Sequence, residues 1–174
     1  MTYREALTHS MEEMARDPAT CFIGYGVKYG GKAAGTLKNV PDSQLIETPV
    51  AENLMVGAAI GMALKGRKPV VFIERFDFIL NAADAIVNHL DKIHAISQGE
   101  FSPNIILRVV TGNRSKPLFT GETHVQDFSE AFRSMVAFPV HALRSAEEVS
   151  GRYQTAFSGL NKHSSMLIEY KDLI

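Results

Sequence analysis

The sequence has little cysteine, no long apolar run and no excess of charge of one sign. The single cysteine, Cys21, cannot form an internal disulfide, and within its apolar run it behaves as a small hydrophobic side chain. Residues 1–20 carry charge throughout and lack the apolar core of a signal peptide. No apolar stretch approaches the roughly 18 residues that a membrane-spanning helix needs. These absences predict a soluble protein of a reducing compartment, and we expect the cytoplasm.

The charge balance also excludes broad classes of partner. Lysine and arginine number 18 against 19 acidic residues, and the formal net charge is -1. A nearly neutral chain has no wide positive field to attract nucleic acid or an anionic membrane, so we expect neither. The sequence also lacks the common motifs of nucleotide-binding, zinc and hydrolase sites. The missing patterns are GxxxxGK[ST], GxGxxG, HExxH, paired CxxC and GxSxG.

Strand and helix patterns alternate along the chain, and 174 residues fit one domain, residues 1–174. The strand-like runs are short and almost wholly apolar, which is typical of strands that are covered on both faces. We therefore predict an α/β fold of three layers, α/β/α, around a mostly parallel central sheet. The predicted helices span 2–17, 50–65, 78–96, 127–136 and a segment from 146, and the predicted strands span 21–25, 45–48, 69–74, 104–110, 140–143 and 165–170.

Helix-start signals are clear at two of these segments and ambiguous at a third. Thr2 with Glu5, and Ser145 with Glu148, have the spacing of a capping box. Thr48 followed by Pro49 predicts a third start, with threonine as the cap and proline in the first turn.

The third start leaves a carboxylate to explain. A capping box from Thr48 would place its glutamate at position 51, but alanine is there and the acid is Glu52. The spacing alone allows two interpretations of Glu52. The helix dipole favours a surface glutamate there by about 0.3 to 1 kcal/mol, or the carboxylate is buried and functional. The small residues that follow Glu52 favour close approach of another backbone or subunit.

Five segments carry a family resemblance, in order and over almost the whole chain. They are MTYREAL, YGG, ETPVAENLMVGAAIGMALKGRKPVVFIERFDF, THVQDF and SSMLIEYKDLI. Together they resemble the pyrimidine-binding domain of thiamine diphosphate enzymes, in the transketolase group, and within it the beta subunit of the decarboxylating component of 2-oxo acid dehydrogenase complexes. The resemblance implies the thiamin diphosphate-binding fold and thiamine diphosphate as the cofactor.

The resemblance also assigns three residues. Glu52 matches the glutamate that hydrogen-bonds the cofactor's aminopyrimidine ring at the nitrogen para to its exocyclic amine. That contact drives the ring toward the imino form that deprotonates the thiazolium carbon, and it needs a carboxylate shielded from water. Phe78 matches an aromatic that stacks on the ring, although base rates alone favour a core phenylalanine; Phe76 is expected in the core. His124 matches a histidine that faces the reacting end of the cofactor, with a purely structural histidine as the alternative.

The other five histidines give no specific signal of a binding site. His9, His89, His94, His141 and His163 show no recurring metal-ligand spacing, so we expect them to be structural or exposed and predict no metal ligands on this chain.

The chain departs from the family pattern at charged positions. Gly24 to Gly26 stand where the family has an acidic GED-like segment. Arg75, Arg114 and Lys116 are cations where uncharged residues are usual, beside Glu74. These three cations either bind a substrate carboxylate or phosphate or are ordinary solvated loop charges.

The likeness covers only half of a cofactor site. The family's beta subunits continue into a further C-terminal domain, and no GDG segment for magnesium and diphosphate appears here. We therefore expect a diphosphate-binding partner subunit that holds magnesium, in a heterotetramer. The predicted function is the pyrimidine-binding subunit of a split enzyme that decarboxylates a 2-oxo acid. The alternatives are half of a transketolase-like transferase that takes a ketose, or a non-catalytic regulatory or scaffolding homologue.

Overall fold

A six-stranded parallel sheet forms the centre of the protein, in the order β2-β1-β3-β4-β6-β5. The computed structural model describes residues 1–118, 121–160 and 162–174. All pairings between neighbouring strands in this part of the chain are parallel, which confirms the predicted α/β class. The strands are β1 (Thr20–Gly24), β2 (Leu45–Glu47), β3 (Lys68–Ile73), β4 (Ile106–Thr111), β5 (Val140–Ala142) and β6 (Ser165–Tyr170).

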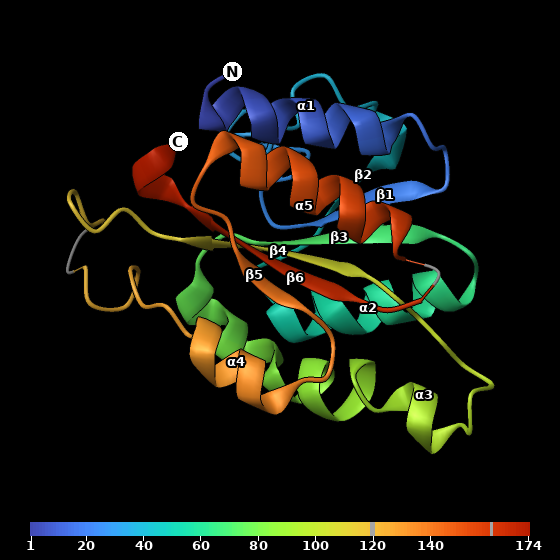
Figure 1. The fold of residues 1–174 in the computed structure, drawn as a ribbon. Coiled ribbons are helices and arrows are strands. Elements are labelled where there is room, and N and C mark those ends of the chain that lie inside the picture. The colour runs from blue at the N-terminus through green and yellow to red at the C-terminus, as the bar shows by residue number, and fades with distance from the viewer. Residues whose placement is uncertain (119–120, 161) are drawn as a thin grey trace.

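Helices cover both faces of the sheet and make the predicted three layers (Figure 1). One face carries α1 (Tyr3–Ala15) and α5 (Ala146–Ser158), which lie side by side. The other face carries the remaining longer elements. These are α2 (Glu52–Leu64), the 3₁₀ segment η2 (Phe76–Ala82), the π-helical segment η3 (Ala85–Leu90), α3 (Ile93–Ile96) and α4 (Ser129–Met135), while the short turns η1 (Asp42–Gln44) and η4 (Lys171–Leu173) flank β2 and β6.

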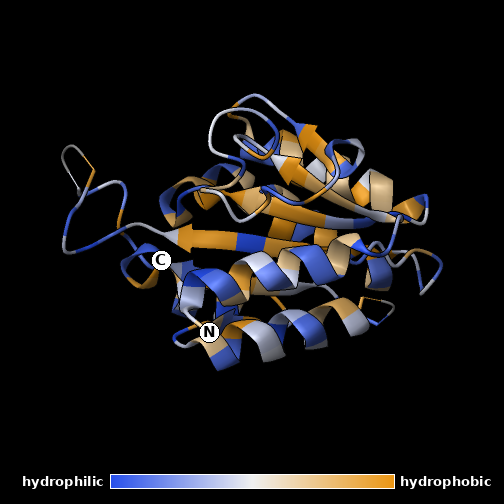
Figure 2. Cartoon of the chain, turned by 90° about the horizontal axis from the view of Figure 1, so that it is seen from above, coloured by the Kyte–Doolittle hydropathy of each residue, from blue (hydrophilic) through white to orange (hydrophobic). Residues whose placement is uncertain are grey.

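Each strand contributes side chains to two apolar cores, because successive residues of a strand point to opposite faces. Phe22, Val70 and Leu167 face α1 and α5. Ile23 and Val71 face α2. The strands are therefore apolar almost without interruption, whereas the outer helices alternate hydrophobic and hydrophilic residues (Figure 2).

Two of the three predicted helix starts are as expected. Thr2 and Glu5 form a full capping box before α1, with Glu5 N–H donating to Thr2 Oγ1 at 3.2 Å and Thr2 N–H donating to the Glu5 carboxylate at 2.7 Å. Ser145 caps α5 by accepting from Glu148 N–H at 3.2 Å. The carboxylate of Glu148 accepts instead from Arg144 N–H, so this second box is only half formed.

The predicted start of α2 is wrong by about two residues. Thr48 N–H donates to the carbonyl of Gly24 at 3.1 Å, so sheet-like pairing continues past β2 and holds Thr48 away from the cap position. Ala51 is the residue before the helix, it makes no side-chain cap, and Glu52 is the first helical residue. The proline is therefore in the connection and not in the first turn.

The predicted helix over 78–96 is broken into η2, η3 and α3. The reason lies in the spacing of its apolar residues. Phe76, Ile79 and Ala82 are fully buried and recur every three residues, which matches the period of a 3₁₀ helix, where side chains three apart lie on one line. In a regular α-helix the same three side chains would spread over an arc of about 120° instead of lying on one line.

Candidate functional site

Glu52 is a buried carboxylate at the beginning of α2. Its exposed fraction is 5%, which a surface glutamate would greatly exceed. Asn81 of η2 donates a hydrogen bond from Nδ2 to Glu52 Oε2 at 3.3 Å, and no other side-chain hydrogen bond to this carboxylate is found within 1–118, 121–160 and 162–174. The helix N-terminus also places the positive end of its dipole beside the acid. The carboxylate therefore keeps acceptor capacity for a group from outside the chain.

Phe78 lies on η2, one 3₁₀ turn before Asn81, and contacts His124. Their ring centroids are 5.5 Å apart and the ring planes are nearly perpendicular, at 82°. Both side chains are half-buried, so each keeps part of its surface open. Phe76, in contrast, is fully buried and contacts Phe128 edge-on, at 5.8 Å between centroids. The structure thus separates a core phenylalanine from a partly open one, as the sequence predicts.

A long loop, 112–128, carries His124 and is tied to η2. Gln126 Nε2 donates to Asp77 Oδ1 at 2.8 Å, and Asp77 is buried. Where the loop folds back, an added Cβ on Gly112 would lie 1.8 Å from the carbonyl oxygen of His124. Only glycine permits this approach, so Gly112 and the Asp77–Gln126 hydrogen bond together fix the position of His124 relative to Phe78.

The three predicted substrate-binding cations do not form one group. Arg75 is buried, and its Nη1 donates to the carbonyl of Glu74 at 2.6 Å. Arg114 and Lys116 are exposed on the 112–128 loop. There Arg114 Nε donates to Val125 O at 3.2 Å, which orders the loop rather than presenting the charge. Arg75 lines a cavity with Arg108 and Lys171, whereas Arg114 lines a different one with Arg144.

Glu47, at the end of β2, was not predicted as a functional residue, yet it organises the loop after β1. Its carboxylate accepts from the backbone N–H groups of Gly26 at 2.5 Å, Lys28 at 2.7 Å and Tyr29 at 3.1 Å. Burial raises the pKa of Glu47, but the backbone donors outweigh burial and hold the pKa below its usual value. The signal that could have found it is its place at the carboxyl end of a strand, next to the end of β1.

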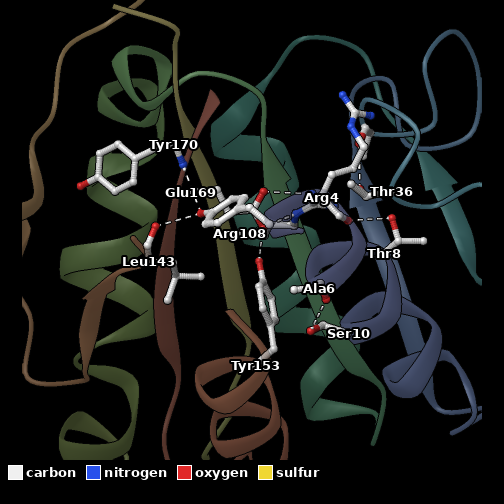
Figure 3. A network of polar contacts seen from close by, with 12 residues as sticks. Arg4, Ala6, Thr8, Ser10, Thr36, Arg108, Leu143, Tyr153, Glu169 and Tyr170 are labelled. Atoms are coloured by element: carbon white, nitrogen blue, oxygen red, sulfur yellow. Dashed lines mark hydrogen bonds and ion pairs between the residues drawn. The ribbon is translucent and has the colours of Figure 1, made fainter. Parts of the chain in front are cut away.

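A buried polar network lies on the opposite face of the sheet, toward α1 and α5 (Figure 3). Arg108 of β4 donates from Nε and Nη2 to the two carboxylate oxygens of Glu169 on β6, at 2.8 and 3.0 Å. Tyr153 of α5 donates to the same carboxylate at 2.5 Å. Burial and the neighbouring Glu169 charge raise the pKa of Tyr153 well above its ordinary value. This network holds β4, β6 and α5 together.

The described residues contain neither a membrane-spanning helix nor a metal-ligand cluster. No helix in 1–118, 121–160 or 162–174 is both long and apolar enough to cross a membrane. The same part of the chain has no group of three or more His, Cys, Asp or Glu side chains placed to hold a metal ion. His89, for example, is exposed and lies 3.3 Å from Asp84.

Known proteins are similar to this chain in sequence. The family profile "Transketolase, pyrimidine binding domain" matches residues 1–174. The beta subunit of the mitochondrial pyruvate dehydrogenase E1 component of Saccharomyces cerevisiae is 34% identical over 166 residues, 92% of this chain and 44% of that protein. The corresponding subunit of Rickettsia conorii is 34% identical over 161 residues, 90% of this chain and 48% of that protein.

A solved structure extends the likeness to the fold. The chain matches one described as "Split gene transketolase, inactive beta4 tetramer", with a TM-score of 0.76 and 13% identity over 98% of this chain and 52% of that one. The chain thus belongs to the transketolase pyrimidine-binding domain family, which is thiamine diphosphate-dependent, as the resemblance implied. It spans about half the length of the curated relatives that it matches.

Proposed function

We propose that this chain is the pyrimidine-binding part of a thiamine diphosphate enzyme that acts on a 2-oxo acid, and that it works with a diphosphate-binding partner subunit. The observation that carries the proposal is the burial of Glu52 at the first residue of α2, with a single side-chain hydrogen bond from Asn81. Similarity to pyruvate dehydrogenase E1 beta subunits supports the choice of a 2-oxo acid as substrate.

The residues present fit an aminopyrimidine ring. Such a ring needs a hydrogen-bond acceptor that is shielded from water and an aromatic face beside it. Glu52 offers the acceptor, and Phe78 offers a half-buried ring on the element that also carries Asn81. When bound, thiamine diphosphate supplies the carbon nucleophile that makes a bond next to a carbonyl breakable.

The chain's own residues then have separate tasks. Glu52 accepts a hydrogen bond from the protonated ring nitrogen, and its buried position strengthens that bond because the local dielectric is low. Phe78 orients the ring through its face. His124 lies against Phe78, where it would face substrate or product as a proton donor or acceptor.

The outward side of α2 is the surface that we assign to the partner. Val50, Leu54 and Leu64 are large apolar side chains that stay exposed there, and Gly57 and Gly61 leave open space around their backbone. A second chain can therefore approach this helix closely and close off Glu52 from water. Magnesium and the diphosphate belong to that partner in this proposal, and the expected assembly is a heterotetramer.

The test is reconstitution. The purified chain is mixed with a candidate diphosphate-binding subunit, thiamine diphosphate and magnesium, and 2-oxo acid consumption is measured. Glu52→Gln should lower turnover by about 100-fold or more, the usual size of an acid-base contribution. The exposed Glu100 provides the control, and Glu100→Gln should leave turnover unchanged. Full activity of Glu52→Gln would refute the assigned role.

Two-carbon transfer is the second candidate, favoured by the transketolase name of the matching family profile. The same reconstituted pair separates the two reactions. A decarboxylating enzyme consumes 2-oxo acid without an aldehyde acceptor, whereas a transferase converts a ketose only when an aldehyde acceptor is present.

A further inference from the structure

A cavity of about 250 Å³ lies on the α1/α5 side of the sheet, at the carboxyl ends of β1, β3 and β4. Phe72 and Arg108 belong to its wall, and Phe72 is a member of the apolar core on the α1/α5 side. Glu52, Phe78 and His124 are not among its lining residues. The cavity and the candidate cofactor site therefore have different lining residues, although Arg75 also lies beside Gly112, where the loop that carries His124 folds back.

Three cationic side chains, those of Arg75, Arg108 and Lys171, line the cavity. Arg108 is 2% exposed, and its Nε and Nη2 are used by Glu169, but Nη1 is buried with no hydrogen-bond partner among the described residues. A buried donor without an acceptor is unfavourable, so this atom favours a partner that the described residues do not supply. Arg75 and Lys171 lie on the same wall. Burial, and then the charge of Arg75, lower the pKa of Lys171.

The acidic residues around the cavity limit the charge of a ligand. Glu169 is held by Arg108 and Tyr153, and Glu47 is held by backbone N–H groups. The exposed Glu74 contacts Arg75 at 3.4 Å, so its carboxylate already occupies a position that a ligand's carboxylate could take. Three cations and three carboxylates balance, so the cavity has no surplus positive charge to compensate a dianion such as phosphate, whereas a single carboxylate can replace Glu74 on Arg75.

A strained segment of backbone, residues 32–34, contributes to the lining of the cavity. Lys32, Ala33 and Ala34 have φ values of 42°, 48° and 55°, in the left-handed region, and both alanines line the cavity. That conformation is unfavourable for non-glycine residues, because Cβ comes too close to the following carbonyl oxygen. The segment is held from outside by Arg4, whose Nη1 donates to Ala34 O at 2.8 Å. Strain of this kind persists where surrounding contacts over-determine the backbone, and such places cluster at ligand sites.

We propose that this cavity binds a small organic acid through a single carboxylate group, which lies between Arg75 and Lys171 and above the Arg108 guanidinium. A planar carboxylate suits a guanidinium, which donates parallel hydrogen bonds to it. This proposal does not rest on the proposed catalytic function, because the binding that it describes needs neither cofactor nor partner.

The test uses the purified chain alone, titrated with acetate, pyruvate and inorganic phosphate by calorimetry, with amide shifts recorded by NMR. We expect saturable millimolar or tighter binding of both carboxylates, weaker binding of phosphate, and shifts at Gly30, Gly31 and Ala34. Lys171→Met and Arg75→Met should each weaken carboxylate binding by about 10-fold or more, the size of one lost charge-assisted hydrogen bond.

Two further variants make the test specific. Glu74→Gln should tighten carboxylate binding by about 3-fold or more, since it removes the competing carboxylate from Arg75. Lys38→Met, at an exposed lysine away from the cavity, should change nothing. Absence of saturable binding, unchanged affinity in Lys171→Met and Arg75→Met, or tighter binding of phosphate than of acetate would overturn the proposal. None of these results bears on turnover by the reconstituted enzyme.

Discussion

Asn81 Nδ2 donates a hydrogen bond to Glu52 Oε2 across 3.3 Å, and this contact joins η2 to the first residue of α2. Asn81 follows Phe78 by three residues, so one 3₁₀ turn sets both the contact to the acid and the position of the aromatic ring. A shift of η2 would therefore move both groups at once.

Asn81→Ala should weaken the proposed cofactor site without unfolding the protein. The variant loses one hydrogen bond, so the free energy of unfolding should fall by about 1 kcal/mol or less. Glu52 is then held less firmly, and we expect a loss of roughly 10-fold in turnover and a weaker affinity for thiamine diphosphate, measured by calorimetry on the reconstituted pair. The exposed Asn88, which donates to Asp84 at 2.8 Å, is the matched control. Equal turnover in Asn81→Ala and Asn88→Ala would show that Asn81 has no positioning role.

Truncation of Phe76 should mainly lower stability, whereas truncation of Phe78 should mainly lower cofactor affinity. Phe76→Ala removes a fully buried ring and should cost about 3 to 5 kcal/mol in urea unfolding. Phe78→Ala removes a half-buried ring, so the stability loss should be clearly smaller while cofactor affinity falls. A Phe78→Ala protein that binds thiamine diphosphate as tightly as the unaltered one would make Phe78 a packing residue only.

Breaking the Arg108–Glu169 pair should be among the most destabilising single changes. Arg108→Met or Glu169→Met leaves its partner buried without compensation, at a cost of about 3 to 5 kcal/mol. The double variant Arg108→Met, Glu169→Met should be less damaging than the sum of the single ones, because no charge then remains buried. Urea unfolding of all three gives the coupling energy.

An exposed ion pair serves as the reference for that cycle. Arg16 lies 2.9 Å from Glu13 with most of its side chain in solvent, so Arg16→Met should change the free energy of unfolding by about 1 kcal/mol at most. If Arg108→Met were equally mild, the buried network would not hold the strands together.

Glu47 should make stability depend on pH. Its folded-state pKa is depressed, so its contribution is present above the unfolded pKa of about 4.3 and is lost as pH falls through the folded value. Glu47→Gln should therefore lower the thermal midpoint at pH 7, and its difference from the unaltered protein should shrink as the pH falls below about 4.3. The exposed Glu100 gives the control variant, Glu100→Gln, which should leave the thermal midpoint unchanged. A difference that stays constant with pH would mean that the Glu47 carboxylate is not what holds residues 26–29.

The fold was predictable because its main signals are local. Unbroken apolar runs identify strands covered on both faces, and the Thr2 and Ser145 caps mark helix starts within four residues of sequence. The family resemblance added the identity of Glu52, Phe78 and His124 as candidates, residue by residue. Local patterns failed at the start of α2, where the hydrogen bond from Thr48 to Gly24 is a contact between distant parts of the chain.

The chain's residues by themselves determined the order of strands and helices, the family, and which aromatic and acidic side chains deserved testing. Tertiary structure alone decided that Asn81 contacts Glu52, that Glu47 binds the loop after β1, and that Arg75 and Lys171 share a cavity wall with Arg108. The physical reason is the parallel sheet. It brings the carboxyl ends of strands that are far apart in sequence to one edge, and no spacing rule along a single chain encodes which side chains meet there.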